Sequence, residues 1–168
     1  MLDGDGVRRV FDSVNSSLVL ILGSFSAAEK PALDLLRDGL QARGYVAVTF
    51  DFARPAERDY AETILTLAGM AAFVVADFTN AKEVRGEVLQ VRNQFRRVPI
   101  IPIALAGAAL PITMANVFAP EELEALVRYV DLPDLAAKVG PGIIDPAKER
   151  AAQIAESIRR SEAFLRGQ

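Results

Sequence analysis

The chain of 168 residues contains no cysteine, no histidine and no tryptophan. Without cysteine there are no disulfides, a composition that suits a reducing compartment, and we expect a cytoplasmic protein. Cysteine or Ser–His nucleophiles, imidazole bases and Cys/His zinc sites are excluded as well. Any acid–base chemistry therefore falls to Asp, Glu, Lys or Tyr.

The sequence also lacks a strong excess of charge and a long apolar run. Lys and Arg number 19 against 22 Asp and Glu, which gives a net charge of -3. This balance offers no general electrostatic basis for nucleic-acid binding, so we expect no such partner. The apolar run Leu18 to Leu22 is far too short for a signal-peptide core or a membrane span. We therefore expect no membrane association.

What the sequence does contain is enough apolar surface for one core. Hydrophobic residues make up 51% of the chain and charged residues 24%. These values exclude wholesale disorder, and the length suits one α/β domain. Residues 1–16 show no sustained pattern and are predicted to be a lead-in or linker segment, whereas residues 17–168 are predicted to form the single domain.

Predicted strands and helices alternate along the domain. Apolar runs predict strands at 18–22, 46–50, 72–78, 98–105 and 127–130. Helical spacing predicts helices at about 27–45, 60–71, 81–95, 133–139 and 146–165. The alternation predicts a three-layer α/β sandwich around a five-stranded parallel sheet, with the flavodoxin-like strand order 2-1-3-4-5.

Two of these segments carry a more detailed expectation. The two prolines of 98–105 favour strand ends or irregular pairing over a regular central strand. The last helix has an apolar stripe that we expect to pack on the sheet. The stripe consists of Ala147, Ala151, Ile154, Ile158 and Leu165.

Ligands of such sheets bind at the carboxyl ends of the strands, near the point between strands 1 and 3 where the order reverses. The first strand is followed there by Ser24 and Phe25, and the second by Phe52 and Arg54. Asp77 ends the third strand. An Asp at a strand end is also a common cap or turn former.

One carboxylate on the helix after the third strand lies near the same edge. At 100° per residue, Val84, Val88, Val91 and Phe95 fall within an arc of about 60° and form the core stripe. Glu87 lies about 60° from Val84, at the margin of this stripe. It is either a partly buried carboxylate facing the cleft, or an ordinary helix-surface glutamate that the helix dipole favours.

The segments "LVLILGSFS", "GYVAVTFDFARP", "ETILTLAGMAAFVVADFTN" and "GEVLQV" together resemble bacterial Toll/interleukin-1 receptor (TIR)-like domains. The resemblance covers roughly residues 17–105, with weaker similarity to about residue 148. It implies a role in bacterial signalling or anti-phage defence, self-association into a homo-oligomer, and cleavage of NAD at the nicotinamide–ribose bond. NAD is then a substrate, and no cofactor is expected. The family's single catalytic glutamate corresponds by position to Glu87.

The implied reaction suits a site without His or Cys. Nicotinamide leaves as a neutral molecule, and one carboxylate can stabilise the oxocarbenium-like transition state. Phe25 and Phe52 are then candidates to stack on the base or nicotinamide, and Ser24 and Arg54 to contact ribose or phosphate. Asp77 is a further candidate substrate contact. Loop packing or a solvated charge explains each of these residues equally well.

Two other functions fit the same pattern. A sheet of this kind with a glutamate at this edge also resembles nucleoside 2-deoxyribosyltransferases, whose glutamate is a nucleophile. Many TIR domains are instead non-enzymatic interaction modules. The loop 51–59 and the apolar connection 106–120 are candidate partner surfaces, although the connection equally suits packing on its own core.

Overall fold

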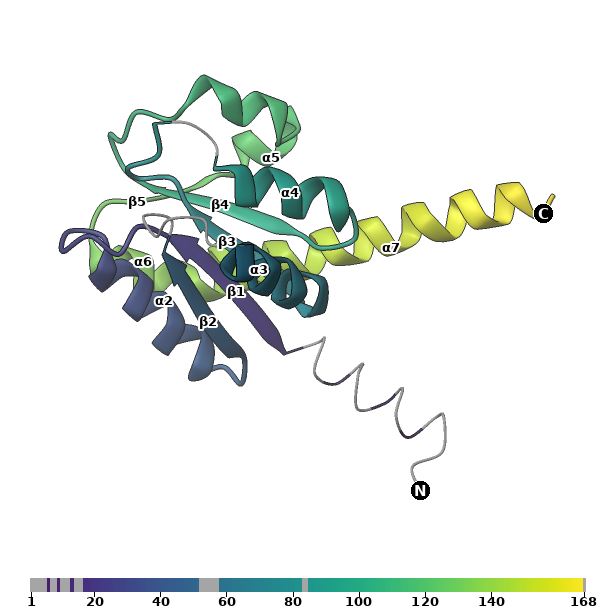
Figure 1. Cartoon of the computed structure of the whole chain (residues 1–168), viewed down its shortest axis with the longest axis horizontal. Helices are drawn as coiled ribbons and strands as arrows, with labels where there is room; N and C mark the ends of the chain where they lie inside the picture. The colour runs from purple at the N-terminus through teal and green to yellow at the C-terminus, as the bar shows by residue number, and fades with distance from the viewer. Residues whose placement is uncertain are drawn as a thin grey trace.

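The computed structural model describes residues 17–51, 58–82 and 85–167, together with Gly6, Arg9 and Ser13. Five strands form one parallel sheet in the order β2-β1-β3-β4-β5 (Figure 1). They are β1 (Leu18–Gly23), β2 (Val46–Asp51), β3 (Phe73–Asp77), β4 (Ile100–Leu105) and β5 (Val127–Tyr129). The predicted α/β flavodoxin-like architecture and strand order are confirmed. The predicted lead-in segment lies almost entirely outside the described residues.

Helices connect the strands and cover both faces of the sheet (Figure 1). They are α2 (Lys30–Gln41), α3 (Arg58–Met70), α4 (Gly86–Gln94), α5 (Pro120–Glu124), α6 (Leu132–Lys138) and α7 (Asp145–Leu165), with a 3-10 turn η1 (Ile112–Asn116) and a π-helical turn η2 (Val139–Ile144). No helix within the described residues is both long and apolar enough to cross a membrane.

The burial of strand β1 on both faces explains why its sequence is apolar without alternation. All six of its residues are buried. Val19 and Ile21 pack with α2, α6 and η2 in one core cluster, whereas Leu20 and Leu22 pack with α3 and α4 in the other. Both faces of the strand are therefore covered, as in parallel sheets generally. Each fully buried side chain of this kind contributes about 1.5–3 kcal/mol to folding.

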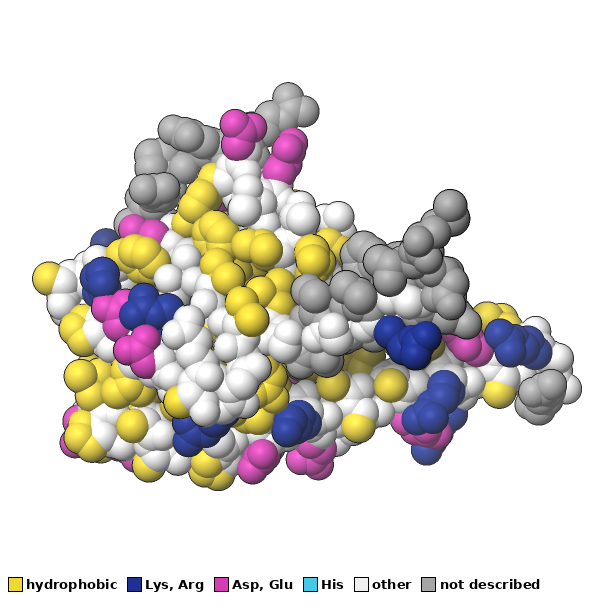
Figure 2. Space-filling model, turned by 90° about the horizontal axis from the view of Figure 1, so that it is seen from below, with side chains coloured by type: hydrophobic (Ala, Val, Ile, Leu, Met, Phe, Trp, Pro, Cys, Tyr) yellow, Lys and Arg dark blue, Asp and Glu magenta, His cyan; other side chains and the backbone are white. Residues whose placement is uncertain are grey.

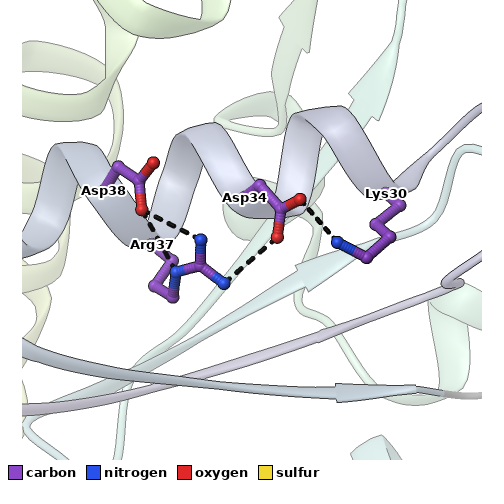
Figure 3. A network of polar contacts seen from close by, with 4 residues as sticks. All are labelled: Lys30, Asp34, Arg37 and Asp38. Atoms are coloured by element: carbon purple, nitrogen blue, oxygen red, sulfur yellow. Dashed lines mark hydrogen bonds and ion pairs between the residues drawn. The ribbon is translucent and has the colours of Figure 1, made fainter.

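The outward face of α2 carries a chain of ion pairs (Figure 3). Lys30 Nζ lies 2.7 Å from Asp34 Oδ2, and Arg37 contacts both Asp34 and Asp38 at 3.1 Å. Seen from below in Figure 2, basic and acidic side chains lie together on this surface. Solvent screens such pairs. They give the helix a solvent-facing polar surface. Its buried residues, among them Leu36 and Leu40, hold it on the sheet.

The place of Pro102 in β4 differs from the expectation that prolines lie at strand ends or in irregular pairing. Pro102 lies inside this central strand, opposite Ala76 of β3. Pro99 and Ile103 accept hydrogen bonds from β3, so the residues that alternate with them face β5. Strand β5 pairs only from Ile103 onward. The missing N–H of Pro102 therefore points to a place where no ladder partner is needed, and the strand tolerates it.

Helix α4 begins later than the predicted start near residue 81. Its first residue is Gly86, and Arg85 before it is extended, with φ -65° and ψ 142°. Ala81 is buried and closes a turn on Phe78. The chain after β3 thus packs down over the sheet edge before it turns into the helix, which places Glu87 in the first turn of α4.

The last helix was predicted wrongly in one respect. Of its expected stripe, Ala147 is buried and Ile154 and Ile158 are half-buried, but Leu165 is 83% exposed. Helix α7 packs on the sheet near its start and then extends away from the domain (Figure 1). In Figure 2 this end shows basic, acidic and apolar side chains together.

Three large apolar side chains of the connection after β4 belong to the core. Met114, Val117 and Phe118 are buried, and the ring of Phe118 meets that of Phe78 edge-on at 5.9 Å. Ile112 is the exception, with 94% of its surface exposed. The structure therefore favours core packing over a partner surface for Met114, Val117 and Phe118 of this segment. The other candidate partner surface, the loop after β2, lies mostly outside the described residues.

Candidate functional site

The carboxyl ends of β1 and β3 lie side by side at the point where the strand order reverses. From β1 the chain passes through α2 to β2, and from β3 it passes through α4 to β4, on the other side. The two connections diverge and leave the crevice in which α/β sheets bind ligands. Leu22 pairs with Ala76, so Ser24 and Asp77, which follow them closely, come to the same edge.

Asp77 is fixed by three hydrogen bonds at the end of β3. It is only 4% exposed. Its Oδ1 accepts the backbone N–H of Thr79 at 2.9 Å and the Thr79 hydroxyl at 2.6 Å, and its Oδ2 accepts the Tyr129 hydroxyl at 3.2 Å. Burial raises the pKa of Asp77, and the hydrogen bonds from Thr79 and Tyr129 partly oppose that rise.

Tyr129 ties this cluster to β5. Burial, and next the nearby charge of Asp77, raise its pKa to about 12. Its hydroxyl also lies 3.3 Å from that of Thr79, which in turn accepts the backbone N–H of Leu105 at 2.9 Å. Strands β3, β4 and β5 are thereby joined at their carboxyl ends. Asp77 thus holds the edge together, in addition to its predicted role as a substrate contact.

Glu29 is the second buried acid at this edge. It lies directly before α2, and its residue surface is 7% exposed. Its side chain does not cap the helix. Instead Oε1 accepts a hydrogen bond from the side-chain amide of Asn80, across the crevice. The other oxygen, Oε2, is buried and has no hydrogen-bond partner within the described part of the chain.

Glu29 and Asp77 both line a small, partly open cavity of about 40 Å³. Its walls are formed by Ser24, Glu29, Asp77, Thr79, Asn80, Ala81 and Arg85. The volume accommodates a water molecule or a hydroxyl-sized group and is far too small for a nucleotide. Any larger ligand would therefore lie over the edge and insert only one small polar group.

Glu87 follows Arg85, a wall residue of this cavity, by two positions. Its side chain is half-buried in the first turn of α4, where the helix dipole favours a negative charge. Among the described residues, none forms a hydrogen bond or ion pair with its carboxylate. Gly86 before it is exposed, and no described atom lies within 4 Å of the place that a Cβ would take.

The remaining predicted contacts do not gather at one point. Ser24 lines the cavity. Phe25 is half-buried and packs against the core cluster around α2, and its backbone N–H donates to Asp51 Oδ1 at 3.1 Å. Phe52 and Arg54 lie outside the described residues. The structure thus brings Ser24 and Asp77 together and places Phe25 closer to a packing role.

Four residues of this edge, Glu29, Thr79, Asn80 and Tyr129, had no role assigned from the sequence. Thr79 and Asn80 follow Asp77 directly, so their place at the edge was visible from the strand end alone. Glu29 precedes a helix, a place where an acid is expected for reasons of the helix dipole. Tyr129 contacts Asp77 across 52 positions of the chain, and no local pattern signals such a contact.

A larger hollow of about 240 Å³ lies elsewhere, beside β4, α5 and α7. Glu122 and Arg150 are part of its lining. Glu122 Oε1 lies 2.9 Å from Arg92 Nη2 and 3.5 Å from Arg150 Nη2. The carboxylate of Glu122 thus pairs with both arginines and joins three helices, so we assign this cluster a structural role. The edge between β1 and β3 is the better candidate site, although its cavity is smaller.

The described residues contain no group of three or more Asp, Glu, His or Cys side chains placed to hold a metal ion. Asp77 and Glu29 are the two buried acids in the described part of the chain, and both have protein hydrogen-bond donors. The chemistry available at the edge is therefore that of carboxylates, hydroxyls and amides: accepting hydrogen bonds and stabilising positive charge.

No protein-family model and no curated protein matches this chain. Among solved structures, a diflavin flavoprotein A3 from Nostoc sp. superposes with a TM-score of 0.54 at 11% identity, covering 82% of this chain and 97% of that one. The TIR domains of the activated Roq1 resistosome, which directly recognises the pathogen effector XopQ, give a TM-score of 0.44 at 14% identity, covering 85% and 99%. At such identities the flavoprotein supports the fold alone, and the weaker match adds nothing to it.

Proposed function

We propose that this chain is a TIR-like domain that cleaves NAD at the nicotinamide–ribose bond, with Glu87 as the key carboxylate. The observation that carries the proposal is the partial burial of Glu87 together with its lack of bonds to other described residues. Glu87 is half-buried at the start of α4, two residues after Arg85 of the cavity wall, and none of the described residues is bonded to its carboxylate. An acid at a ligand-binding edge that the fold does not use is available to a substrate. The sequence resemblance names the substrate.

The proposed reaction needs no other acid or base from the protein. The bond between the ribose C1 and the nicotinamide nitrogen breaks, and both electrons go to the positively charged ring, which leaves neutral. Glu87 stabilises the positive charge that develops on the ribose. Water then adds at C1 and loses a proton to solvent, so that the products are ADP-ribose, nicotinamide and one proton.

The small cavity implies that a single copy offers an incomplete binding surface. A nucleotide over the edge would touch Ser24 and Asp77 at the cavity mouth, while most of its surface stayed exposed. Tight ligand sites bury most of the ligand. We therefore propose that activity requires a homo-oligomer, in which a neighbouring copy covers the nucleotide.

A non-enzymatic interaction module is the second candidate function. It is favoured by the end of α7, where Phe164 is 82% and Leu165 is 83% exposed on a helix that extends from the domain. Exposed apolar side chains that lie together mark partner surfaces. In this case the buried acids at the sheet edge would be structural only, and the protein would bind no nucleotide.

The test is nicotinamide release from NAD by concentrated protein, with and without a crowding agent, followed by chromatography. Parent protein is expected to release nicotinamide, and Glu87→Gln to lose the activity by about 100-fold or more, as in other sites that lose one stabilising group. Glu124→Gln, on exposed α5, is the matched control and should retain parental activity. Thymidine together with an added free acceptor base tests the deoxyribosyltransferase alternative. Base exchange on thymidine without turnover of NAD would overturn the proposal.

A further inference from the structure

The unpartnered oxygen of Glu29 has no structural purpose in the described fold. A buried acceptor without a donor costs stability, and the cost is larger for a charged group. A glutamine here would keep the oxygen that accepts from Asn80, and it would replace the second oxygen by a neutral NH2 group and so remove the buried charge. The chain nevertheless carries a glutamate, at a position where only 7% of the residue surface is exposed.

Three side-chain donors beside the cavity are already engaged. The side-chain amide of Asn80 donates to Oε1 of Glu29 itself. The hydroxyl of Thr79 donates to Asp77 Oδ1, and that of Tyr129 donates to Asp77 Oδ2. These three donors do not reach Glu29 Oε2, and a bound molecule that enters the cavity can supply a donor for it.

The size and chemistry of the cavity restrict that donor. About 40 Å³ admits a hydroxyl group and excludes an aromatic ring or a phosphate. Two carboxylates, Glu29 and Asp77, form part of the wall and repel an anionic group, and the cation in the wall, Arg85, is already engaged. A metal cation is less well served, because no metal-binding cluster of acidic side chains exists among the described residues. A neutral hydroxyl group satisfies both the limit on size and the limit on charge.

We propose that Glu29 Oε2 accepts a hydrogen bond from a ribose hydroxyl of the substrate, so that this edge selects ribonucleotides over their 2-deoxy counterparts. The inference rests on the proposed function for the nature of the nucleotide, and it assigns Glu29 to substrate binding beside Glu87. A site that hydrogen-bonds a substrate hydroxyl rejects the analogue lacking it, because the buried acceptor is then left unpaired again.

The test uses binding, which does not depend on turnover. The probes are ADP-ribose and the analogue that lacks the 2-hydroxyl of the terminal ribose, each titrated calorimetrically into the parent protein and into Glu29→Gln. We expect the parent to prefer ADP-ribose, and Glu29→Gln to bind it about 10- to 100-fold more weakly and to lose the preference. Glu124→Gln should behave as the parent.

Stability separates binding from a structural role. If Glu29 serves the ligand, Glu29→Gln without ligand unfolds at the same or a higher urea concentration than the parent, because a neutral amide costs less to bury than a carboxylate with one unpaired oxygen. If Glu29 is structural, the variant unfolds earlier and binding is unchanged. Absence of ADP-ribose binding by the parent, or equal binding of both probes, overturns the inference. Selective binding without nicotinamide release refutes the proposed cleavage and supports the role of Glu29.

Discussion

Replacing Thr79 by valine tests the hydrogen-bonded cluster that holds the site together. The substitution keeps the shape of the side chain but removes the hydroxyl, which donates to Asp77 Oδ1 at 2.6 Å and accepts from Leu105 N–H at 2.9 Å. Leu105 is 37% exposed, so water can replace its lost acceptor. The main loss is the hydrogen bond to the buried carboxyl group of Asp77, which is worth about 1.5–3 kcal/mol when the acceptor is charged.

The same substitution has a defined dependence on pH. Burial raises the pKa of Asp77 above its ordinary 3.8, and hydrogen bonds from Thr79 act against this rise. A raised folded-state pKa means that the stability contributed by this group is complete below the unfolded pKa and is lost as pH rises through the folded pKa. Thr79→Val raises the folded pKa further. Its penalty should therefore be smaller below pH 3.8 and grow toward neutral pH.

The assay is urea unfolding followed by circular dichroism, at a pH below 3.8 and near neutrality. Thr79→Ser, which retains the hydroxyl, is the matched control. We expect Thr79→Val to lower the free energy of unfolding by about 2 kcal/mol at neutral pH. A loss of less than about 0.5 kcal/mol, as for an ordinary surface substitution, would refute the reasoning. So would a penalty that shrinks as pH rises.

Two further predictions concern packing and charge. A Cβ on Gly23 would lie 2.7 Å from a methyl carbon of buried Leu33, so Gly23→Ala should lower the free energy of unfolding in urea by about 1–3 kcal/mol. At Gly86 no described atom lies within 4 Å of the place of a Cβ. Gly86→Ala should therefore be neutral or stabilising by up to about 1 kcal/mol. Equal effects of the two would contradict the packing described. Arg92→Met should cost about 2–4 kcal/mol, because it removes the nearer cation from the largely buried Glu122, and adding Glu122→Gln should restore part of the loss. A fully additive double variant would count against this charge pair.

The sheet could be predicted because each strand is marked by residues that are close together in the sequence. Continuous apolar runs such as the one that became β1 mark strands buried on both faces, and their alternation with amphipathic helices fixes the class of fold. The carboxyl ends of the strands follow from the direction of the chain. Ser24 and Asp77 could therefore be assigned to one edge from the sequence alone.

The start of α4 and the role of Glu29 depend on contacts that the sequence does not display. Residues near 81 have helix-forming neighbours, but Ala81 is drawn into the core and Asn80 is held by Glu29, 51 positions away. The helix consequently begins at Gly86. Glu29 has the local appearance of an acid at a helix start, and only the fold of the chain after β3 buries it.

The end of α7 was mispredicted for a related reason. Helical spacing of apolar residues indicates a face, but it does not show how far the surface beneath that face extends. The stripe continues to Leu165, whereas the sheet ends much earlier. Periodicity alone cannot distinguish a packed stripe from an exposed one.

The most direct test of the account is a crystal structure of Glu87→Gln with NAD, since this variant is expected to bind the nucleotide without cleaving it. We predict density at the carboxyl ends of β1 and β3, with the nicotinamide ribose beside residue 87 and one of its hydroxyls within hydrogen-bond distance of Glu29 Oε2. Density confined to the hollow beside β4, α5 and α7, or a nucleotide whose ribose points away from Glu29, would contradict the account.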